Sequence, residues 1–285
     1  MKKIIVTGCN GQLGRAINLE LGNRTDIEFV NTDVAELDIT NIDKVMELAR
    51  QVQPYAIINC AAHTGVDACE DEWDKAYRIN AIGPRNLSIA ASETGAKMIH
   101  VSTDYIFDGK ADRPYIEFDK PNPQGAYGTT KLVGENMVKD FADRYFIFRT
   151  AWLYGDGKNF VKTMLRLSES HDKVRVVGDQ VGSPTSAKEL AGVIAHLLFT
   201  ENYGVFHATC EGSCSWAQFA EEIFKLAGKS TVVETITTEE FGAKAPRPAY
   251  SILENYMLKL TTDYMFADWH DALTAYMKNL ALDET

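Results

Sequence analysis

Short apolar runs alternate along the chain with longer stretches in which apolar residues recur every three or four positions. Nearly continuous apolar runs of this length are typical of strands that are buried on both faces of a parallel sheet. We therefore expect strands at 3–8, 27–32, 55–61, 97–103, 145–150, 174–179 and 203–208. The periodicity between them predicts helices at about 12–22, 41–52, 70–94, 126–142, 159–170 and 187–199.

This alternation of strands and helices predicts the α/β class, with a Rossmann-type, doubly wound parallel sheet. The pattern changes after residue 209, where a helix at about 215–227 is followed by the loop APRPAYS and by short segments. We expect two domains. The Rossmann domain spans 1–154 plus about 187–209, and a smaller C-terminal α/β domain spans about 155–186 plus 210–285.

Charge and composition narrow the class of protein. The 285 residues carry 29 basic and 40 acidic side chains, a net charge of −11, which argues against a general binder of nucleic acid or of anionic membranes. No apolar run reaches membrane-spanning length, and the N-terminal MKKIIVTGCNG does not resemble a signal peptide, so we expect a cytoplasmic protein. The five cysteines lack the spacing of a zinc site, and we expect reduced thiols and no metal.

The first strand leads into a glycine-rich turn, VTGCNGQLG, which opens the first helix. Gly8 permits a tight turn, Gly11 lets a pyrophosphate approach the backbone, and Gly14 lets the helix pack against the strand. The free N–H groups of the helix N-terminus then face the phosphates. The turn predicts a dinucleotide site; the alternative is a tight strand–helix turn without a ligand.

Residues after the second strand bear on the choice of cofactor. Asp33 lies 25 residues after Gly8, where a carboxylate can accept hydrogen bonds from the ribose hydroxyls of NAD, although it could equally be a loop or cap residue. Asp38 and Ile39 could frame the adenine, or Asp38 could cap the next helix. Arg15 is a cation that would favour the 2′-phosphate of NADP. NADH and NADPH therefore both remain open, with Asp33 in favour of NADH.

The third strand ends in NCAAHT, and its small residues would let a cofactor lie against the backbone. Ala61 and Ala62 are the candidates for this contact. His63 could line the site as well, although a lone histidine is more often merely hydrogen-bonded.

A tyrosine and a lysine lie one helical turn apart in AYGTTK. Tyr127 and Lys131 share a helix face, so the ammonium can lower the pKa of the phenol, which is ordinarily near ~10. Tyr127 then fits a general acid for a carbonyl oxygen whose carbon gains a hydride. Thr103, at the end of the fourth strand in STDYIFDG, can hydrogen-bond the same oxygen. Y-x-x-x-K alone is a weak signal, and the glycine turn and Thr103 strengthen it.

With these motifs the chain resembles the extended short-chain dehydrogenase/reductases, and within them the dTDP-4-dehydrorhamnose reductase family. The resemblance runs over nearly the whole chain. It is carried by GCNGQLG, NCAA, HTGVDACE, STDYIFDG, YGTTK, RTAWLYG, NFVKTM, DQVGSPTS and RPAYSIL.

The resemblance implies that NAD(P)H reduces the 4-keto group of dTDP-4-dehydro-L-rhamnose to give dTDP-L-rhamnose, with the smaller domain holding the nucleotide sugar. Thr103, Tyr127 and Lys131 would form the catalytic triad. From the turn, the strand ends and the resemblance together, we expect cofactor contacts from Gly8, Asn10, Gly11, Gln12, Leu13, Asp33, Asp38, Ile39, Ala61, Ala62, His63, Ser102, Tyr127 and Lys131.

Substrate contacts are expected from Thr103, Asp104, Tyr127, Trp152 and Arg247. Trp152 would pack on the apolar face of the deoxysugar, unless it is a core tryptophan. Arg247 is the candidate for the substrate diphosphate, because an anion needs a cation, but it could be an ordinary surface arginine.

The chain departs from the family in its first helix. Some members dimerise around magnesium that is held by glutamates, one of them in this helix, whereas here the sequence reads Arg15-Ala16. We therefore expect a monomer, or a dimer not bridged by magnesium, and no metal in the chemistry. Two alternatives remain: another extended nucleotide-sugar reductase or epimerase, or a non-catalytic regulatory subunit like the beta subunit of methionine adenosyltransferase.

Overall fold

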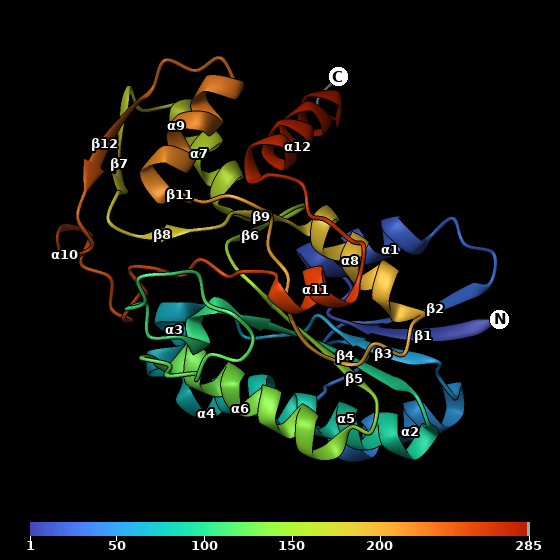
Figure 1. Cartoon of the computed structure of the whole chain (residues 1–285). Coiled ribbons are helices and arrows are strands. Elements are labelled where there is room, and N and C mark those ends of the chain that lie inside the picture. The colour runs from blue at the N-terminus through green and yellow to red at the C-terminus, as the bar shows by residue number, and fades with distance from the viewer. Residues whose placement is uncertain (284–285) are drawn as a thin grey trace.

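A six-stranded parallel sheet forms the centre of the computed structural model, which describes residues 1–283 (Figure 1). Its strand order is β10-β5-β4-β3-β1-β2. Neighbouring strands end in register, as where Thr7 lies opposite Asn59 and Thr103 opposite Thr150. The strands are β1 (Lys2–Thr7), β2 (Ile27–Thr32), β3 (Ala56–Asn59), β4 (Lys97–Thr103), β5 (Tyr145–Thr150) and β10 (Gly204–His207).

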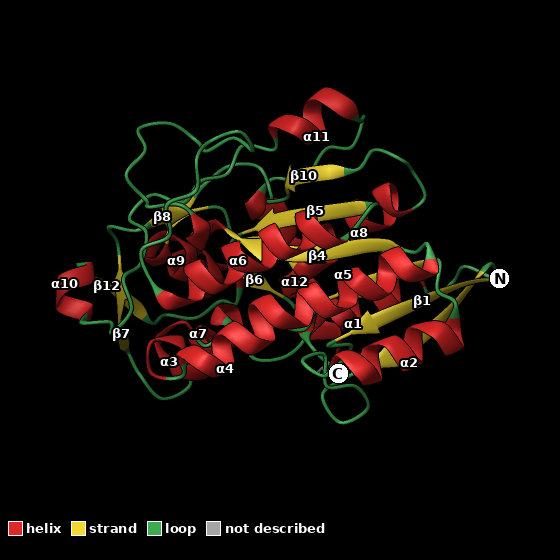
Figure 2. Cartoon of the chain, turned by 90° about the horizontal axis from the view of Figure 1, so that it is seen from below, coloured by secondary structure: helices red, strands yellow, loops and turns green. Residues whose placement is uncertain are grey.

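Helices cover both faces of this sheet, which confirms the predicted doubly wound α/β fold. On one face, α1 (Gln12–Leu21) and α8 (Ala187–Leu198) pack together through leucine and isoleucine side chains. On the other face lie α2 (Ile42–Val52), α5 (Gly83–Thr94) and α6 (Ala126–Phe141), which lie in front of the sheet in Figure 2.

The helix predicted at 70–94 is wrong in its continuity. The segment contains α3 (Val66–Asp71), α4 (Trp73–Tyr77), the π-helical turn η1 (Arg78–Ile82) and α5. The helical backbone breaks at Glu72, where φ is −108° and ψ is 43°. Pro84 lacks an N–H and cannot bond the carbonyl of Asn80, and the backbone there passes through the π turn without a gap. Helix α6 packs closely over this carbonyl, because a Cβ on Gly134 would lie only 2.2 Å from the Asn80 oxygen.

The run at 174–179 forms a strand, as predicted, and this strand lies outside the central sheet. It forms β7 (Lys173–Val177), which pairs in parallel with β12 (Val232–Ile236) in a separate two-stranded sheet. Its valines alternate with the exposed Lys173 and Arg175, as expected for a strand with one solvated face.

A second lobe contains this small sheet and has its own apolar core. Phe219 and Ile223 on α9 (Trp216–Leu226) pack there against Val161 on α7 (Phe160–Ser168). The remaining elements are η2 (Asp104–Ile106), β6 (Leu153–Tyr154), β8 (Val181–Gly182), β9 (Thr185–Ser186), β11 (Cys214–Ser215), α10 (Thr238–Phe241), α11 (Tyr256–Thr261) and α12 (Trp269–Asp283).

The C-terminal segments do not all belong to this lobe. Leu258 on α11 and Phe266 join the apolar cluster beneath α1 and α8, although both fall in the range predicted for the smaller domain. The division into two domains stays a prediction. Within residues 1–283, no helix is long and apolar enough to cross a membrane.

Candidate active site

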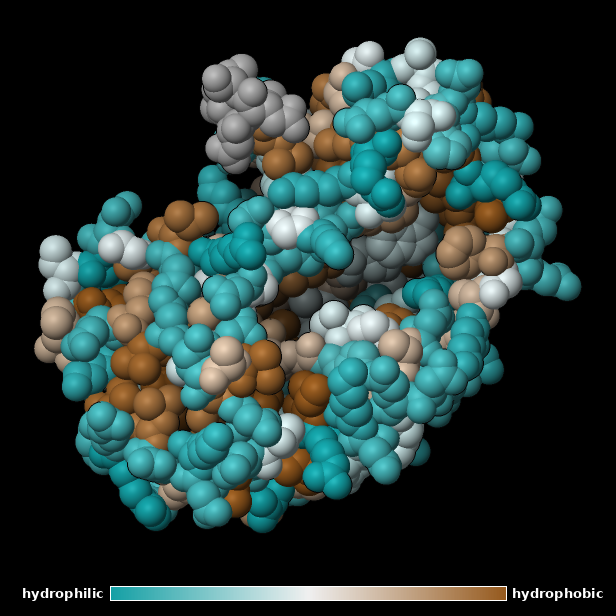
Figure 3. Space-filling model, turned by 180° about the vertical axis from the view of Figure 1, so that it is seen from behind, coloured by the Kyte–Doolittle hydropathy of each residue, from teal (hydrophilic) through white to brown (hydrophobic). Residues whose placement is uncertain are grey.

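Two adjoining cavities lie at the carboxyl ends of the central strands. Their volumes are about 630 and 500 Å³, and both are lined by Gly11, Cys60, Ala61 and Ala62, so they form one continuous cleft. The space-filling view shows the surface deeply hollowed below the second lobe (Figure 3). A cleft outside the carboxyl ends of the strands is where open α/β sheets bind ligands.

The glycine turn fits closely against β3, as the sequence predicts. Gly8 has a φ of +65°, and a Cβ there would lie 2.8 Å from the backbone nitrogen of Ala61. A Cβ on Gly14 would lie 2.5 Å from the carbonyl oxygen of Gly8. Gly11 is the N-cap residue of α1 and has no side chain that could cap the helix. The N–H groups of the first turn of α1 therefore remain available to an anion.

The larger cavity runs from this turn past the end of β2. Asp33 lines it, and its carboxylate accepts hydrogen bonds from the backbone N–H groups of Asn10, at 3.2 Å, and Val34, at 2.8 Å. Asp38 and Ile39 also line it. Asp38 does not cap α2: its carboxylate accepts from Thr40, which lowers its pKa, and Asn41 caps the helix instead.

Two cations also line this cavity. These are Lys75 on α4 and Arg78 on η1. The sequence did not predict either residue at the cavity, because their positions depend on how the segment 66–94 divides into short helices. Arg15 has a different role from the one considered for it. Its guanidinium donates a hydrogen bond of 2.6 Å to Asp156, and both side chains are largely exposed.

The smaller cavity brings the predicted triad together. Thr103 ends β4, Tyr127 and Lys131 lie on α6, and all three side chains line this cavity with Ser102 and Asp104. Lys131 is 2% exposed and donates from Nζ to the carbonyl oxygen of Val101 at 2.6 Å. Burial lowers the pKa of Lys131 to about 8, although Glu135 and Cys60 act in the opposite direction.

The pKa of Tyr127 differs from the expectation that Lys131 would lower it. Burial raises the pKa of this phenol well above its ordinary value, and the hydroxyl of Thr103 opposes that shift only in part. The phenol therefore stays protonated at neutral pH. This state suits a proton donor. The hydrogen-bond partner of the phenol is the hydroxyl of Thr103.

An aromatic pair closes the smaller cavity on the side of the second lobe. Trp152 has a φ of +49°, which is rare for a residue with a side chain, and its ring stacks on Trp216 with the centroids 3.6 Å apart. Both rings line the cavity, so Trp152 is not simply a core residue. The sequence reasoning missed Trp216, which α9 brings from far along the chain.

Three predicted contacts, those of Asn10, His63 and Arg247, are absent from the cavity walls formed by residues 1–283. The ring of His63 pairs with Glu72 at 3.0 Å. Arg247 lines a third cavity of about 210 Å³, where it donates to Asp67 at 2.9 Å and to the phenol oxygen of Tyr105 at 3.3 Å. Tyr105 lines both this third cavity and the smaller cleft cavity.

No metal centre forms in the part of the chain that the structure describes, where no three His, Cys, Asp or Glu side chains gather suitably. Of the other predicted cofactor contacts, Gln12, Leu13, Ala61 and Ala62 line the smaller cavity, and Gly8, Ala61 and Ala62 line the larger one. Their contact with a cofactor stays a prediction.

Comparisons with known proteins agree with this arrangement. A family model described as the RmlD substrate binding domain matches residues 1–282. A solved dTDP-4-dehydrorhamnose reductase from Clostridium acetobutylicum is 53% identical, with a TM-score of 0.97 over 98% of this chain and 99% of its own. A solved protein of the same name from Bacillus anthracis, in complex with NADP, is 44% identical, with a TM-score of 0.96 over 98% and 100%. The spore coat polysaccharide biosynthesis protein SpsK of Bacillus subtilis is 39% identical over 98% of each chain.

Proposed function

The chain belongs to the family described as the RmlD substrate binding domain, and we propose that it is a dTDP-4-dehydrorhamnose reductase. The reaction is the reduction of the 4-keto group of dTDP-4-dehydro-L-rhamnose by NAD(P)H, which gives dTDP-L-rhamnose for the synthesis of polysaccharides. The observation that carries this proposal is that a glycine phosphate turn and a Thr–Tyr–Lys set line one continuous cleft.

The cleft fits a nicotinamide dinucleotide. No side chain caps the N-terminus of α1 after Gly11, so the N–H groups of its first turn are available to a pyrophosphate. In this proposal Ile39 and Asp38 hold the adenine end, Gln12 and Leu13 flank the pyrophosphate, and Lys131 holds the nicotinamide ribose. The bound cofactor supplies the hydride that reduces the keto carbon.

The chain's own side chains handle the proton. Tyr127 donates the proton of its phenol to the carbonyl oxygen as the carbon is reduced, and Thr103 hydrogen-bonds the same oxygen and orients it. In this proposal Lys131, which is one helical turn from Tyr127 on α6, stabilises the phenolate that Tyr127 becomes. Trp152, stacked on Trp216, presents an apolar wall to the methyl-bearing face of the deoxysugar.

Charged residues that line the larger cavity bear on the choice between NADH and NADPH. Asp33 would bind the ribose hydroxyls of NADH, whereas Lys75 and Arg78 could neutralise the 2′-phosphate of NADPH. We propose that the chain uses both cofactors.

The oligomeric state and the location also remain proposals. Arg15 in the first helix is paired with Asp156, and we propose a monomer or a dimer that needs no magnesium. Arg247 lines the third cavity and donates to Tyr105, which also lines the cleft, and we keep its contact with the substrate diphosphate as a proposal. We place the enzyme in the cytoplasm, where nucleotide sugars are made.

Absorbance at 340 nm tests the function. The protein is mixed with dTDP-4-dehydro-L-rhamnose, made in situ by the preceding pathway enzymes, and with NADH or NADPH in separate cuvettes. A protein-dependent fall with dTDP-L-rhamnose as the product supports the proposal and ranks the cofactors. A flat trace from protein that still binds the cofactor would contradict it and favour another sugar or a regulatory role.

A further inference from the structure

We propose that Asp104 acts as a positioning residue: its protonated carboxyl donates to Thr103 and so releases the hydroxyl hydrogen of Thr103 to the reacting carbonyl. In this proposal Ser251, from the segment after Arg247, is the partner of the other carboxyl oxygen. This inference rests on the proposed reductase function and assigns a role to two residues outside the triad.

The hydrogen bonds of Thr103 carry the first step. Its Oγ1 lies 2.9 Å from Oδ1 of Asp104, and it accepts from the backbone N–H of Tyr105 at 3.2 Å. A threonine hydroxyl has one hydrogen and two lone pairs, and an ionised carboxylate can only accept. While Asp104 is ionised, the hydrogen of Thr103 is therefore held by the carboxylate and cannot point at a substrate oxygen.

A proton on Asp104 reverses this bond. The carboxylic acid then donates to the remaining lone pair of Thr103, and the hydrogen of Thr103 is free to reach the carbonyl oxygen alongside that of Tyr127. Two donors on one developing oxyanion stabilise it better than one. Asp104 keeps this proton throughout the reaction, so the proton that the substrate gains still comes from Tyr127.

The surroundings of Asp104 suit a carboxyl that is easily protonated. Its side chain is 2% exposed, and burial raises its pKa to about 6, against the hydroxyls of Ser251 and Thr103 and nearby backbone N–H groups. The titratable groups that face it are the phenols of Tyr105, on its own η2, and Tyr127, on α6. Within residues 1–283, no cation is among the groups that set its pKa.

Ser251 reaches this carboxyl from a segment that is fixed on both sides. Its backbone N–H donates to Val181 of β8 at 2.9 Å, and that of Tyr250 donates to Gly109 at 3.2 Å. Ser251 is 1% exposed. Oδ2 of Asp104 and Oγ of Ser251 are both buried, and neither has another hydrogen-bond partner within residues 1–283, so each is available to the other.

The test is the pH dependence of kcat between about pH 5.5 and 7.5 for matched variants. In the wild type, kcat falls as the pH rises through the pKa of Asp104 in the substrate complex. Asp104→Asn carries a permanent N–H donor, with its amide oxygen toward Ser251, and its kcat becomes independent of pH in this window. Asp104→Leu keeps the bulk without a donor, and its kcat falls by about 10- to 100-fold.

Ser251→Ala gives a second measurement that does not alter the triad. The hydroxyl of Ser251 donates to the charged carboxylate, so its loss raises the pKa of Asp104. The fall of kcat with pH then moves to higher pH by about one unit. Ser183→Ala is the control, because Ser183 is equally buried in the same lobe but donates to Gly212. In this control variant, kcat falls over the same pH range as in the wild type.

The outcomes separate the two proposals. If the wild type does not oxidise NADH or NADPH with the substrate, the reductase function itself fails, and this inference with it. If the wild type turns over but Asp104→Asn keeps the wild-type decline, or loses as much kcat as Asp104→Leu, only the role of Asp104 is overturned. A decline that stays in place in Ser251→Ala overturns the role of Ser251.

Discussion

Tyr127 and Thr103 present two hydroxyl groups to the cavity that Lys131 also lines. The spacing of these residues made the set predictable, since i and i+4 share a helix face and a residue that ends a parallel strand faces the cleft. The state of the phenol was not predictable. Its pKa depends on burial, and burial comes from packing that the motif does not contain.

Removal of the proton donor Tyr127 should slow the reduction step and leave the binding of the cofactor unchanged. We expect Tyr127→Phe to lower kcat by on the order of 10²–10⁴ and to leave the Kd of NADPH nearly unchanged, because the ring still fills its site. Steady-state kinetics and a fluorescence titration measure the two quantities. Turnover equal to that of the wild type would remove Tyr127 from the mechanism.

Asp33 should discriminate between the two cofactors. Asp33→Ala removes the carboxylate expected to bind the ribose hydroxyls, so the Kd of NADH should rise by about 10-fold and that of NADPH by less. Glu47→Ala, on the exposed side of α2, is the matched control for the change in charge. Equal losses for the two cofactors would make Asp33 a structural residue of the turn.

At the scale of elements, α6 determines where the triad lies. Gly128 follows Tyr127, and a Cβ on it would lie 2.1 Å from the carbonyl oxygen of Tyr105, so the helix approaches the segment after β4 directly at the active site. This close approach lets a residue on α6 and one at the end of β4 serve the same oxygen.

A methyl group at this contact should move the helix. We expect Gly128→Ala to lower kcat by about 10²-fold, because a displacement near 1 Å is enough to misplace a catalytic group. Asn136→Ala, at an exposed position of α6, is the control and should leave kcat in place. Comparable kcat values for the two variants would show that the site tolerates movement of α6.

The elements that the sequence predicted well are those with a clear pattern. Continuous apolar runs identified the strands of the central sheet, since their burial on both faces leaves no alternation. The predicted long helix differs for a local reason, because its backbone breaks at Glu72. The alternation of Lys173 and Arg175 with valines indicates that β7 has one solvated face. Trp216 and Arg78 could not be assigned to the cleft, because only tertiary packing brings their helices to it.

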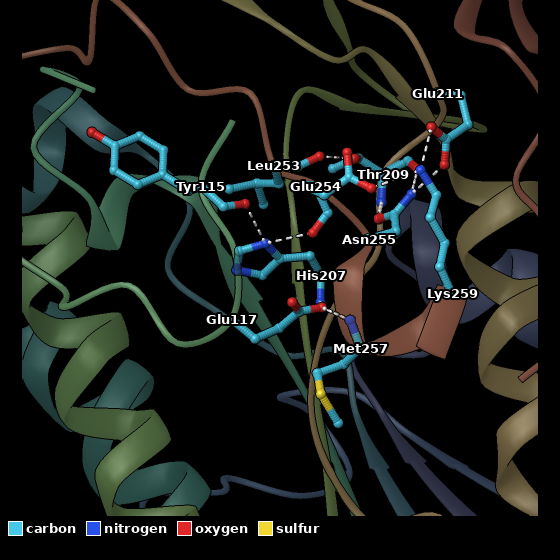
Figure 4. A network of polar contacts seen from close by, with 10 residues as sticks. All are labelled: Tyr115, Glu117, His207, Thr209, Glu211, Leu253, Glu254, Asn255, Met257 and Lys259. Atoms are coloured by element: carbon cyan, nitrogen blue, oxygen red, sulfur yellow. Dashed lines mark hydrogen bonds and ion pairs between the residues drawn. The ribbon is translucent and has the colours of Figure 1, made fainter. Parts of the chain in front are cut away.

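At the scale of the whole molecule, a buried polar network joins the edge of the central sheet to the C-terminal segment (Figure 4). Nδ1 of His207, on β10, bonds the carbonyl oxygens of Tyr115 at 3.0 Å and Glu254 at 3.1 Å. Glu117 accepts from the backbone N–H groups of His207 and Met257. Nδ1 therefore carries the hydrogen, and Nε2, which lies 3.5 Å from a guanidinium nitrogen of Arg149, remains an acceptor, so the imidazole is neutral.

This network should make the fold sensitive to acid. Burial, with help from Arg149, lowers the pKa of His207 to about 3, whereas in the unfolded chain it is ordinarily near ~6.5. Between these values the unfolded chain binds a proton that the folded chain does not. Stability from His207 is therefore complete above pH 6.5 and falls as the pH drops, by about 1.4 kcal/mol per unit.

Denaturant unfolding at pH 7, 6 and 5 measures this slope. His207→Gln should be less stable than the wild type at pH 7 but should lose less stability on acidification. His171→Gln, at an exposed histidine, is the control and should keep the wild-type slope. A slope for His207→Gln as steep as that of the wild type would show that other groups cause the acid sensitivity.

The central claim is that the cleft transfers a hydride from the nicotinamide to the 4-keto carbon of the sugar. The most direct measurement is NMR of the product formed with NADPH that carries deuterium at both C4 positions. We expect dTDP-L-rhamnose with deuterium on C4 of the sugar, and no such product from Tyr127→Phe at matched times. Product without deuterium at C4, or unreduced nucleotide sugar beside bound cofactor, would contradict the claim.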